Sequence, residues 1–160
     1  MIYYLSLGSN LGAREQTLRE ALKRIGQQVG TVLRCSSFFY SEPWGFDSPN
    51  AFCNLCCAVE TTLPPMEVLL ATQAIECSLG RTEKSTNGQY HDRPIDIDLI
   101  RAFDDCGKEI YVQMANDQMV NDRMVNDQMV NDRMVNSLFL PHPLWQQRDF
   151  VRIPLAEIMF

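Results

Sequence analysis

Two segments of the chain carry apolar residues at the spacing of an amphipathic helix. The first runs from about residue 13 to residue 29, with apolar positions at steps of four and three: Leu18, Leu22, Ile25 and Val29. The second follows Pro64 and Pro65, which suit the first turn of a helix, and continues at helical spacing until Gly80. Such spacing gives a helix one apolar face, so both segments are predicted to be helices that cover a core.

Several apolar segments bounded by turn-forming residues predict strands. In chain order they read IYYLSL, TVLRCSSFFY, AFCNLCCAVETT, RPIDIDL and LFL. Through RPIDIDL the order is strand, helix, strand, strand, helix, strand, which matches the split unit of a ferredoxin-like fold. The predicted class is therefore α+β, a ferredoxin-like sandwich with a mainly antiparallel sheet, its helices packed on one face and the other face open for a ligand. After a turn or short helix at Arg148 and Phe150, FVRIPL is interpreted as either another strand or a docking segment.

One segment, from about residue 114 to residue 136, has a methionine at every fifth position and fits neither pattern. Five residues advance a helix by about 500°, so successive methionines lie about 140° apart, and in a strand odd spacing alternates the faces. A β-solenoid is disfavoured because this length makes little more than one coil. We predict a flexible surface insertion within a single domain spanning residues 1–160, with an extended hairpin or a helical excursion as alternatives.

Composition and charge narrow the classes of function. A chain of 160 residues with 46% hydrophobic residues fits one globular domain. Its formal net charge of -6 gives no basic excess for non-specific binding of nucleic acid. No segment approaches the ~20 apolar residues of a membrane span, and the first residues lack the pattern of a secretory signal. We therefore expect a cytoplasmic monomer that acts on small molecules, with neither nucleic acid nor membrane as a partner.

The cysteines follow no disulfide framework and lie mainly in apolar segments, as buried thiols of a reducing compartment do. Cys53 and Cys56 form a C-x-x-C motif, for which zinc binding or redox chemistry is the alternative. No second cysteine pair and no pair of histidines completes such a site in the sequence, so the thiol interpretation is preferred.

Asp96 and Asp98 lie two residues apart in a segment that otherwise reads as buried strand. Because successive side chains of a strand face opposite ways, the two carboxylates share one face, while Ile95, Ile97 and Leu99 share the other. At roughly 6–7 Å and an effective dielectric of about 20 the carboxylates repel by about 2.5 kcal/mol, which calls for a counter-charge. Nearby arginines and the oxygen ligands suit a magnesium-bound polyphosphate. The alternative is the solvent face of an edge strand, salt-bridged to those arginines.

Aromatic residues and an amide suggest a second component of the site. They are Trp44, Phe46, Phe52 and Asn54 around the long loop between two predicted strands, and Phe150 beside Arg148. Two rings can sandwich a flat heterocycle while an amide hydrogen-bonds its edge. The alternative is that these rings belong to the ordinary core.

Seven motifs follow one another along the chain: LGSNLG, SSFFYSEPWG, FCN, IECSLGR, RPIDIDL, LPHP and RDFVRIPLAEI. In this order and approximate spacing they resemble the 6-hydroxymethyl-7,8-dihydropterin pyrophosphokinase family of folate biosynthesis, and RPIDID with the downstream LPHP is the most specific part. The resemblance spans nearly the whole chain. It implies a ferredoxin-like fold and a magnesium-dependent transferase that moves pyrophosphate from ATP to the pterin alcohol and releases AMP.

Carried over residue by residue, the resemblance implies three groups of site residues. Asp96 and Asp98 would hold two magnesium ions that bridge the ATP phosphates, and with Arg81 and Arg93 they would form the catalytic set. The ATP contacts would be Glu76, Arg81, Lys84, Arg93, His142 and Arg148. The pterin pocket would comprise Ser41, Pro43, Trp44, Phe52, Asn54 and Phe150. Ser137 lies where many members have a basic residue, so one phosphate contact is expected to be missing.

Two other functions fit the same residues. One is a ferredoxin-like module that senses a nucleotide without turning it over, and the other is a magnesium-dependent nucleotidyl or phosphoryl transferase with a different acceptor. The clustered acids and cations argue against the sensor, because binding alone seldom needs two acids that face the interior.

Overall fold

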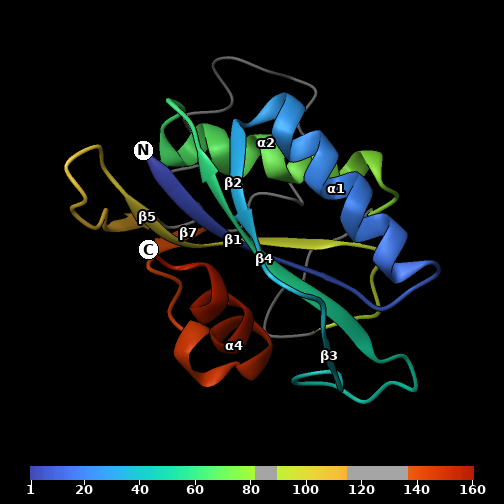
Figure 1. The fold of residues 1–160 in the computed structure, drawn as a ribbon. Coiled ribbons are helices and arrows are strands. Elements are labelled where there is room, and N and C mark those ends of the chain that lie inside the picture. The colour runs from blue at the N-terminus through green and yellow to red at the C-terminus, as the bar shows by residue number, and fades with distance from the viewer. Residues whose placement is uncertain (82–89, 115–136) are drawn as a thin grey trace.

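The computed structural model describes residues 1–81, 90–114 and 137–160. Within these residues the centre of the molecule is an antiparallel sheet in which β2, β4, β1 and β5 lie side by side and β3 also pairs with β4 (Figure 1). The strands are β1 (Ile2–Ser9), β2 (Thr31–Cys35), β3 (Phe39–Ser41), β4 (Phe52–Glu60) and β5 (Asp96–Phe103). The predicted α+β class with a mainly antiparallel sheet is confirmed.

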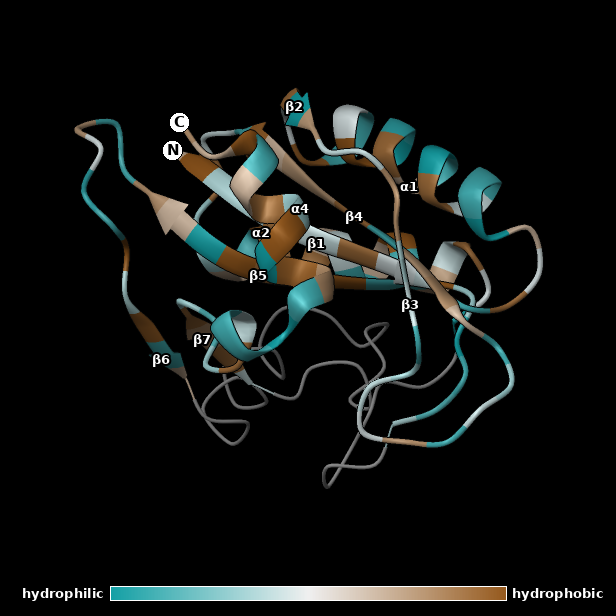
Figure 2. Ribbon diagram, turned by 60° about the horizontal axis from the view of Figure 1, so that its bottom comes forward, coloured by the Kyte–Doolittle hydropathy of each residue, from teal (hydrophilic) through white to brown (hydrophobic). Residues whose placement is uncertain are grey.

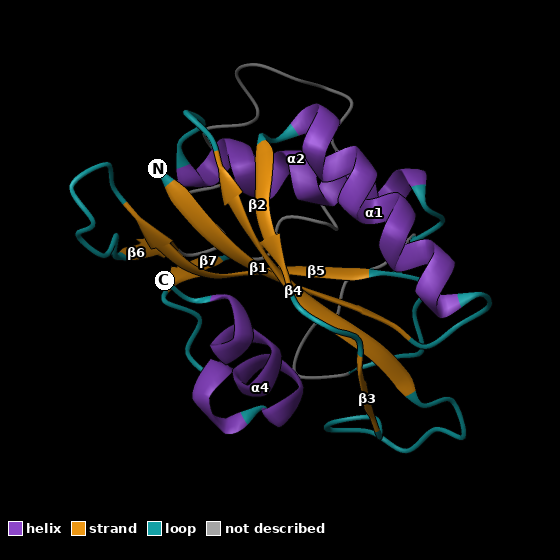
Figure 3. Ribbon diagram, in the orientation of Figure 1, coloured by secondary structure: helices purple, strands orange, loops and turns teal. Residues whose placement is uncertain are grey.

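Two helices, α1 (Arg14–Gln28) and α2 (Pro65–Ser78), cover one face of this sheet (Figure 3). Leu18 of α1 and Ile75 of α2 are buried against inward residues of the strands, such as Leu5 and Leu55. Figure 2 shows hydrophobic and hydrophilic residues alternating along α1, as the apolar spacing predicts. Both helices lie close to their predicted limits. None of the helices in the described part of the chain is long and apolar enough to cross a lipid bilayer.

A further helix, α4 (Asp149–Ile158), packs against the opposite face of the sheet at one end of the strands. Its buried residues Val151, Leu155 and Ile158 form a second core cluster with residues such as Tyr4 and Ile100. The interpretation of FVRIPL as a strand is therefore wrong. The spacing of the three buried residues, at steps of four and three, is that of a helix face, and it outweighs the strand preference of the branched residues. The other end of this sheet face is left for a pocket.

The segment TVLRCSSFFY forms two strands and not the single strand that its composition predicts. Between them, the backbone N–H of Ser36 donates to the carbonyl of Cys56 at 2.9 Å, and the Ser36 hydroxyl accepts the N–H of Cys56 at 2.9 Å. The next N–H, of Ser37, donates to the carboxylate of Glu157 at 2.9 Å. These side-chain bonds compete with the ladder, so regular pairing with β4 stops and resumes at Phe39.

A small antiparallel sheet consists of β6 (Val112–Met114) and β7 (Leu138–Leu140), which confirms LFL as a strand. Met114 pairs with Leu138, so the described residues on either side of residues 115–136 lie close together. Apart from Met114, the five-residue repeat lies outside the described residues, and its predicted conformation stays a prediction.

Gly30 joins α1 to β2 where two backbone segments approach closely. A Cβ atom on Gly30 would lie 2.2 Å from the carbonyl oxygen of Glu60 and 2.7 Å from Cβ of Thr61. We predict that Gly30→Ala lowers the free energy of unfolding, measured in urea, by about 1–3 kcal/mol, the usual cost of overpacking.

The matched control is Gly26→Ala in α1, where a Cβ atom would meet nothing within 4 Å. Alanine favours a helix over glycine, so this variant should raise the free energy of unfolding by about 0.5–1 kcal/mol. If Gly30→Ala were as stable as Gly26→Ala, the close approach would be contradicted.

Candidate active site

Asp96 and Asp98 lie on β5 and face the side of the sheet opposite α1 and α2. Asp96 is paired with Gly8 of β1, and Asp98 with Ser6. The intervening Ile97 is fully buried in the core, which confirms the predicted alternation. The residues of β1 beside the two carboxylates are a glycine and a serine. Because these side chains are small, they leave room for a ligand above this part of the sheet.

A pocket opens over this part of the sheet, walled by the loop between β3 and β4, by the start of α4 and by the segment before β5. The structure brings together in its lining most of the residues that sequence predicted for the site. They are Ser41, Trp44, Phe52, Asn54, Arg93, Asp96, Asp98, Arg148 and Phe150.

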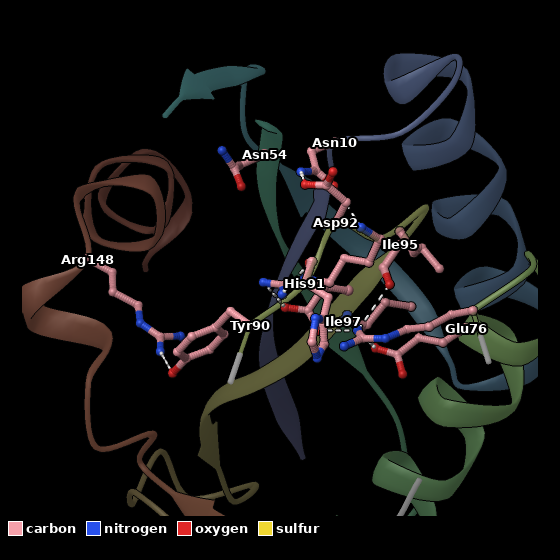
Figure 4. A network of polar contacts seen from close by, with 12 residues as sticks. Asn10, Asn54, Glu76, Tyr90, His91, Asp92, Ile95, Ile97 and Arg148 are labelled. Atoms are coloured by element: carbon pink, nitrogen blue, oxygen red, sulfur yellow. Dashed lines mark hydrogen bonds and ion pairs between the residues drawn. The ribbon is translucent and has the colours of Figure 1, made fainter. Parts of the chain in front are cut away.

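Arg81 links the start of β5 to α2 from beneath the pocket. One of its nitrogens, Nη1, contacts a carboxylate oxygen of Asp96, donates to the carbonyl of Ile95 at 3.0 Å and lies 3.3 Å from Oε1 of Glu76. The same Glu76 oxygen accepts the N–H of Ile97 at 2.6 Å (Figure 4). Burial acts to lower the pKa of Arg81, but the charges of Asp96 and Glu76 outweigh it and raise the pKa above its usual value. The guanidinium therefore stays charged and compensates the carboxylates.

Arg93 and Arg148 place two further cations at the pocket. Nη2 of Arg93 lies 3.4 Å from Oδ2 of Asp96, and its guanidinium lies over the ring of Phe52, 5.1 Å from the centroid. The guanidinium of Arg148 lies 4.4 Å from the centroid of Trp44 and donates to the hydroxyl of Tyr90 at 3.1 Å (Figure 4). Among the described residues, the buried Nε of each arginine has no hydrogen-bond acceptor. An anion in the pocket could satisfy these donors with charge-assisted bonds.

Asn54 is oriented by its neighbours on β3. Its Nδ2 donates to the carbonyl of Phe39 at 3.0 Å and to the hydroxyl of Ser41 at 2.9 Å. Both amide protons are thereby used, and Oδ1 remains as an acceptor. This oxygen lies beside Gly8, because a Cβ atom added to Gly8 would be 3.0 Å from it. The residue thus offers the pocket one fixed acceptor, close to the Phe52 ring.

Residues 4–160 match the family described as 7,8-dihydro-6-hydroxymethylpterin-pyrophosphokinase (HPPK). The chain belongs to this family. A 2-amino-4-hydroxy-6-hydroxymethyldihydropteridine pyrophosphokinase of Porphyromonas gingivalis is 43% identical over 157 residues, which are 98% of this chain and 90% of that protein. The protein of the same name from Bacillus subtilis is 32% identical over 98% of this chain and 77% of its own length.

Among solved structures, a crystal structure of Plasmodium falciparum HPPK-DHPS has the same fold, with a TM-score of 0.67 and 13% sequence identity. The match covers 98% of this chain and 41% of that one, so the chain spans less than half of that protein. Together with the family match, this agrees with the ferredoxin-like fold that the element order predicts. As a member of the pyrophosphokinase family, the chain is a transferase with ATP as its co-substrate.

The remaining residues that the family resemblance implies are not gathered in the pocket. Glu76 and Arg81 are buried beneath it, and Pro43 lies in the adjacent loop without lining it. His142 borders a second depression that shares Asp98 with the pocket, and its Nδ1 accepts the N–H of Leu144 at 3.1 Å. Ser137 lines this depression too. Lys84 lies outside the described residues, so its role, like those of the others, stays a prediction.

Tyr90 is a pocket residue that sequence reasoning missed. Its ring packs edge-on against Trp44 at 5.9 Å between centroids, and its hydroxyl accepts from Arg148. A Cβ atom on Gly45 would lie 3.0 Å from this ring, so the loop and the ring are in close contact. The available signal was an aromatic residue alone within the polar stretch RTEKSTNGQYHDR.

The cysteine pair Cys53 and Cys56 cannot act as a redox or zinc motif through local pairing. Cys53 belongs to the core cluster under α1 and α2, whereas Cys56 lies on the other sheet face, where its Sγ contacts the carbonyl of Val151 at 3.6 Å. Within the described residues no three histidine, cysteine, aspartate or glutamate side chains are arranged to hold a metal ion. The interpretation as buried thiols therefore holds for this pair.

Thiol accessibility provides a test of this arrangement. Cys35, Cys77 and Cys106 are exposed, whereas Cys53, Cys56 and Cys57 are buried, and burial raises the pKa of Cys56 to about 12. Because the thiolate is the reactive form, we predict that iodoacetamide at pH 8 modifies the exposed three in the native protein and the buried three only in denaturant. Peptide mass spectrometry measures this. Native modification of Cys56 as fast as Cys106 would contradict the burial.

Proposed function

We propose that the reaction of this family, transfer of pyrophosphate from ATP to 6-hydroxymethyl-7,8-dihydropterin with release of AMP in folate biosynthesis, takes place in the pocket over Asp96 and Asp98. The observation that carries the proposal is the convergence, on one sheet face, of two carboxylates, two arginines whose Nε atoms have no acceptor in the described part of the chain, and an amide acceptor flanked by rings. The partners are these small molecules. That the chain acts as a monomer, and as one domain over residues 1–160, stays a prediction.

The pterin would bind between the rings of Phe52 and Phe150. A pterin is flat and carries N–H donors on its edge, so the oriented Oδ1 of Asn54 can accept from it while the rings cover its faces. Trp44 and the backbone near Ser41 would close the side of this pocket. The rings exclude water from the hydroxymethyl group, which would then point toward Asp96 and Asp98.

The triphosphate would lie against Arg93 and Arg148. Both guanidiniums border the pocket, both have a buried Nε that lacks an acceptor among the described residues, and arginine suits phosphate oxygens because its donors form a planar fork. His142 would contact the phosphates from the neighbouring depression that shares Asp98. These contacts hold the β-phosphorus near the pterin hydroxyl.

Asp96 and Asp98 would hold magnesium, and two ions are the number that the family resemblance implies. The donor set fits, because two hard carboxylate oxygens on one face with room for phosphate oxygens and water are what magnesium prefers. When bound, the ions would neutralise charge on the triphosphate. Arg81 would hold the Asp96 carboxylate in place from the other side.

In the proposed step, the hydroxymethyl oxygen of the pterin attacks the β-phosphorus of ATP. A new oxygen–phosphorus bond forms, the bond between the β-phosphorus and the bridging oxygen of the AMP portion breaks, AMP leaves with that electron pair, and the hydroxyl proton is released. The arginines stabilise the charge that develops on the bridging oxygen. None of the described residues that line the pocket stands out as a general base, so catalysis would depend on position and charge.

Product analysis separates this function from its rivals. Incubation with ATP, magnesium and 6-hydroxymethyl-7,8-dihydropterin should yield AMP in step with the pterin pyrophosphate. ADP in its place would indicate a simple kinase reaction on a phosphate acceptor. Binding of ATP without turnover would indicate a nucleotide sensor.

The carboxylate pair yields a direct test of the site. We predict that Asp98→Asn lowers kcat by at least about 100-fold, because a neutral amide is a poor magnesium ligand and leaves charge on the triphosphate uncompensated. Asp96→Asn should have the same effect on turnover, but it also removes a charge partner of Arg81, so Asp98→Asn is the cleaner variant. Circular dichroism and urea unfolding check that Asp98→Asn remains folded, and near wild-type kcat in it would refute the metal role.

Gly8 yields a test of the pterin side. A Cβ atom there would lie 3.0 Å from Oδ1 of Asn54 and 3.5 Å from the Phe52 ring, in the space proposed for the pterin edge. We predict that Gly8→Ala raises KM for the pterin about tenfold, a loss of about 1.4 kcal/mol, and changes KM for ATP by less than about twofold. Steady-state kinetics measures both, with Gly26→Ala as the control. An unchanged KM for the pterin would place that substrate elsewhere.

A further inference from the structure

Asn10, the residue after β1, is bonded to two segments that wall the pocket. Its Nδ2 donates to the backbone carbonyl of Asn50 at 3.2 Å and to Oδ1 of Asp92 at 2.7 Å. Its Oδ1 accepts the N–H of Arg93 at 2.8 Å, and its own N–H donates to the carbonyl of Arg93 at 3.2 Å. The Asn10 side chain is buried, and its two bonds to Arg93 fix the backbone of that residue from both sides.

Asp92 joins the same two segments by a second contact. Its Oδ2 accepts from Nδ2 of Asn50 at 2.8 Å, while Oδ1 accepts from Asn10 (Figure 4). Hydrogen bonding from Ser48, supported by the bonds from Asn10 and Asn50, lowers the pKa of Asp92 below its usual value, so the carboxylate accepts these bonds as an anion throughout the neutral range. Asp92 does not line the pocket among the described residues, so its contacts serve other residues of the chain.

The two segments carry opposite sides of the proposed site. The loop of residues 42–51 presents Trp44 and leads into Phe52, the ring side, whereas the segment before β5 presents Tyr90 and Arg93, the phosphate side. The loop has no strand partner in the described chain. Hydrogen bonds hold its last residues, where Arg14 also donates to the carbonyl of Ala51 at 2.7 Å, and nearer its start Trp44 packs against the ring of Tyr90. The hydrogen bonds of Asn10 and Asp92 thus contribute to the spacing between ring side and phosphate side.

We propose that Asn10, Asn50 and Asp92 form a clamp that positions the pterin loop against Arg93, with Asp92 as the positioning residue at its centre. The proposal rests on the function assigned above, because it supposes a pterin on one side of the clamp and phosphates on the other. Asp92 acts through Asn50 and Arg93 and touches neither substrate. The Asp92 carboxylate is a bidentate acceptor: one oxygen accepts from the side-chain amide of Asn10 and the other from the side-chain amide of Asn50.

The kinetic test compares Asp92→Ala, Asp92→Asn and the control Asp47→Ala, an exposed aspartate of the same loop. Asp92→Ala removes both acceptors and should lower kcat/KM for the pterin about tenfold, because small misplacements of reacting groups have large effects on rate. Asp92→Asn should stay within about threefold, since its oxygen still accepts from Asn10 and its NH2 can donate to Asn50 once that amide rotates. Asp47→Ala should match the wild type. An Asp92→Asn loss as large as that of Asp92→Ala would overturn the clamp in favour of a charge effect.

A double variant tests whether the clamp acts as a unit. Asn50→Ala combined with Asp92→Ala should lower kcat/KM no further than Asp92→Ala alone, because both changes break the same contact. Losses that multiply would show independent roles and overturn the proposal. Wild-type kcat/KM in Asp92→Ala would overturn it as well.

Hydrogen exchange in the protein without substrates separates failure of the clamp from failure of the proposed function. In Asp92→Ala, amides of residues 42–51 should exchange at least about tenfold faster than in the wild type, and in Asp47→Ala they should not. Faster exchange confirms the clamp even if the wild type produced no pterin pyrophosphate, a result that would refute the reaction alone. Unchanged exchange in Asp92→Ala would overturn the clamp even in an active pyrophosphokinase.

Discussion

The contact of Arg81 with Asp96 is the interaction on which the rest of the site depends. A guanidinium only 3% exposed must be compensated, because desolvation of an unpaired charge costs several kcal/mol, and Asp96 and Glu76 supply the opposite charges. The same contact partly compensates the repulsion between Asp96 and Asp98, since a fixed cation next to one carboxylate lowers the electrostatic cost of placing both carboxylates on one sheet face. Glu76 extends the effect to the backbone by accepting the N–H of Ile97, between the two aspartates. Charge balance and strand position are therefore set together.

The sheet serves two purposes because its two faces are covered differently. On the inner face, Ile97 and Leu99 continue the core under α1 and α2. On the outer face, α4 buries Tyr4 and Ile100 at one end of the strands, and the small side chains of β1 leave the other end low. The buried sheet under the pocket supports the site carboxylates and amides, so that contacts within the protein hold these groups in position before a ligand binds.

Periodic features of the fold and the site could be predicted from the sequence, and features that depend on distant contacts could not. The alternation along β5 predicted which face holds Asp96 and Asp98, and helical spacing predicted α1 and α2, because each pattern is local. The break between β2 and β3 depends on bonds from Ser36 and Ser37 to residues far along the chain, which no local pattern shows. The stacking of Arg148 on Trp44, and hence the place of Tyr90, likewise requires α4 to meet a loop about a hundred residues earlier. The motifs named most pocket residues through family resemblance, and without it the rings would have remained candidates for the core.

The five-residue repeat lies in the sequence between two parts of the site, and strand pairing joins the described residues on either side of it. Met114 on β6 pairs with Leu138 on β7, so the chain is closed by strand pairing before residue 115 and after residue 136. For a flexible loop the entropy of closure grows only with the logarithm of its length, about 0.6 kcal/mol for each doubling, so the flexible insertion that the sequence predicts would have little effect on the structure that holds its ends. Beyond β7, the N–H of His142 donates to the carbonyl of Ile100 at 2.8 Å and ties the chain back to the strand of the aspartates. The pairing of β6 with β7 and the bond from His142 to Ile100 thus hold this part of the chain beside the strand of the aspartates independently of contacts with the repeat.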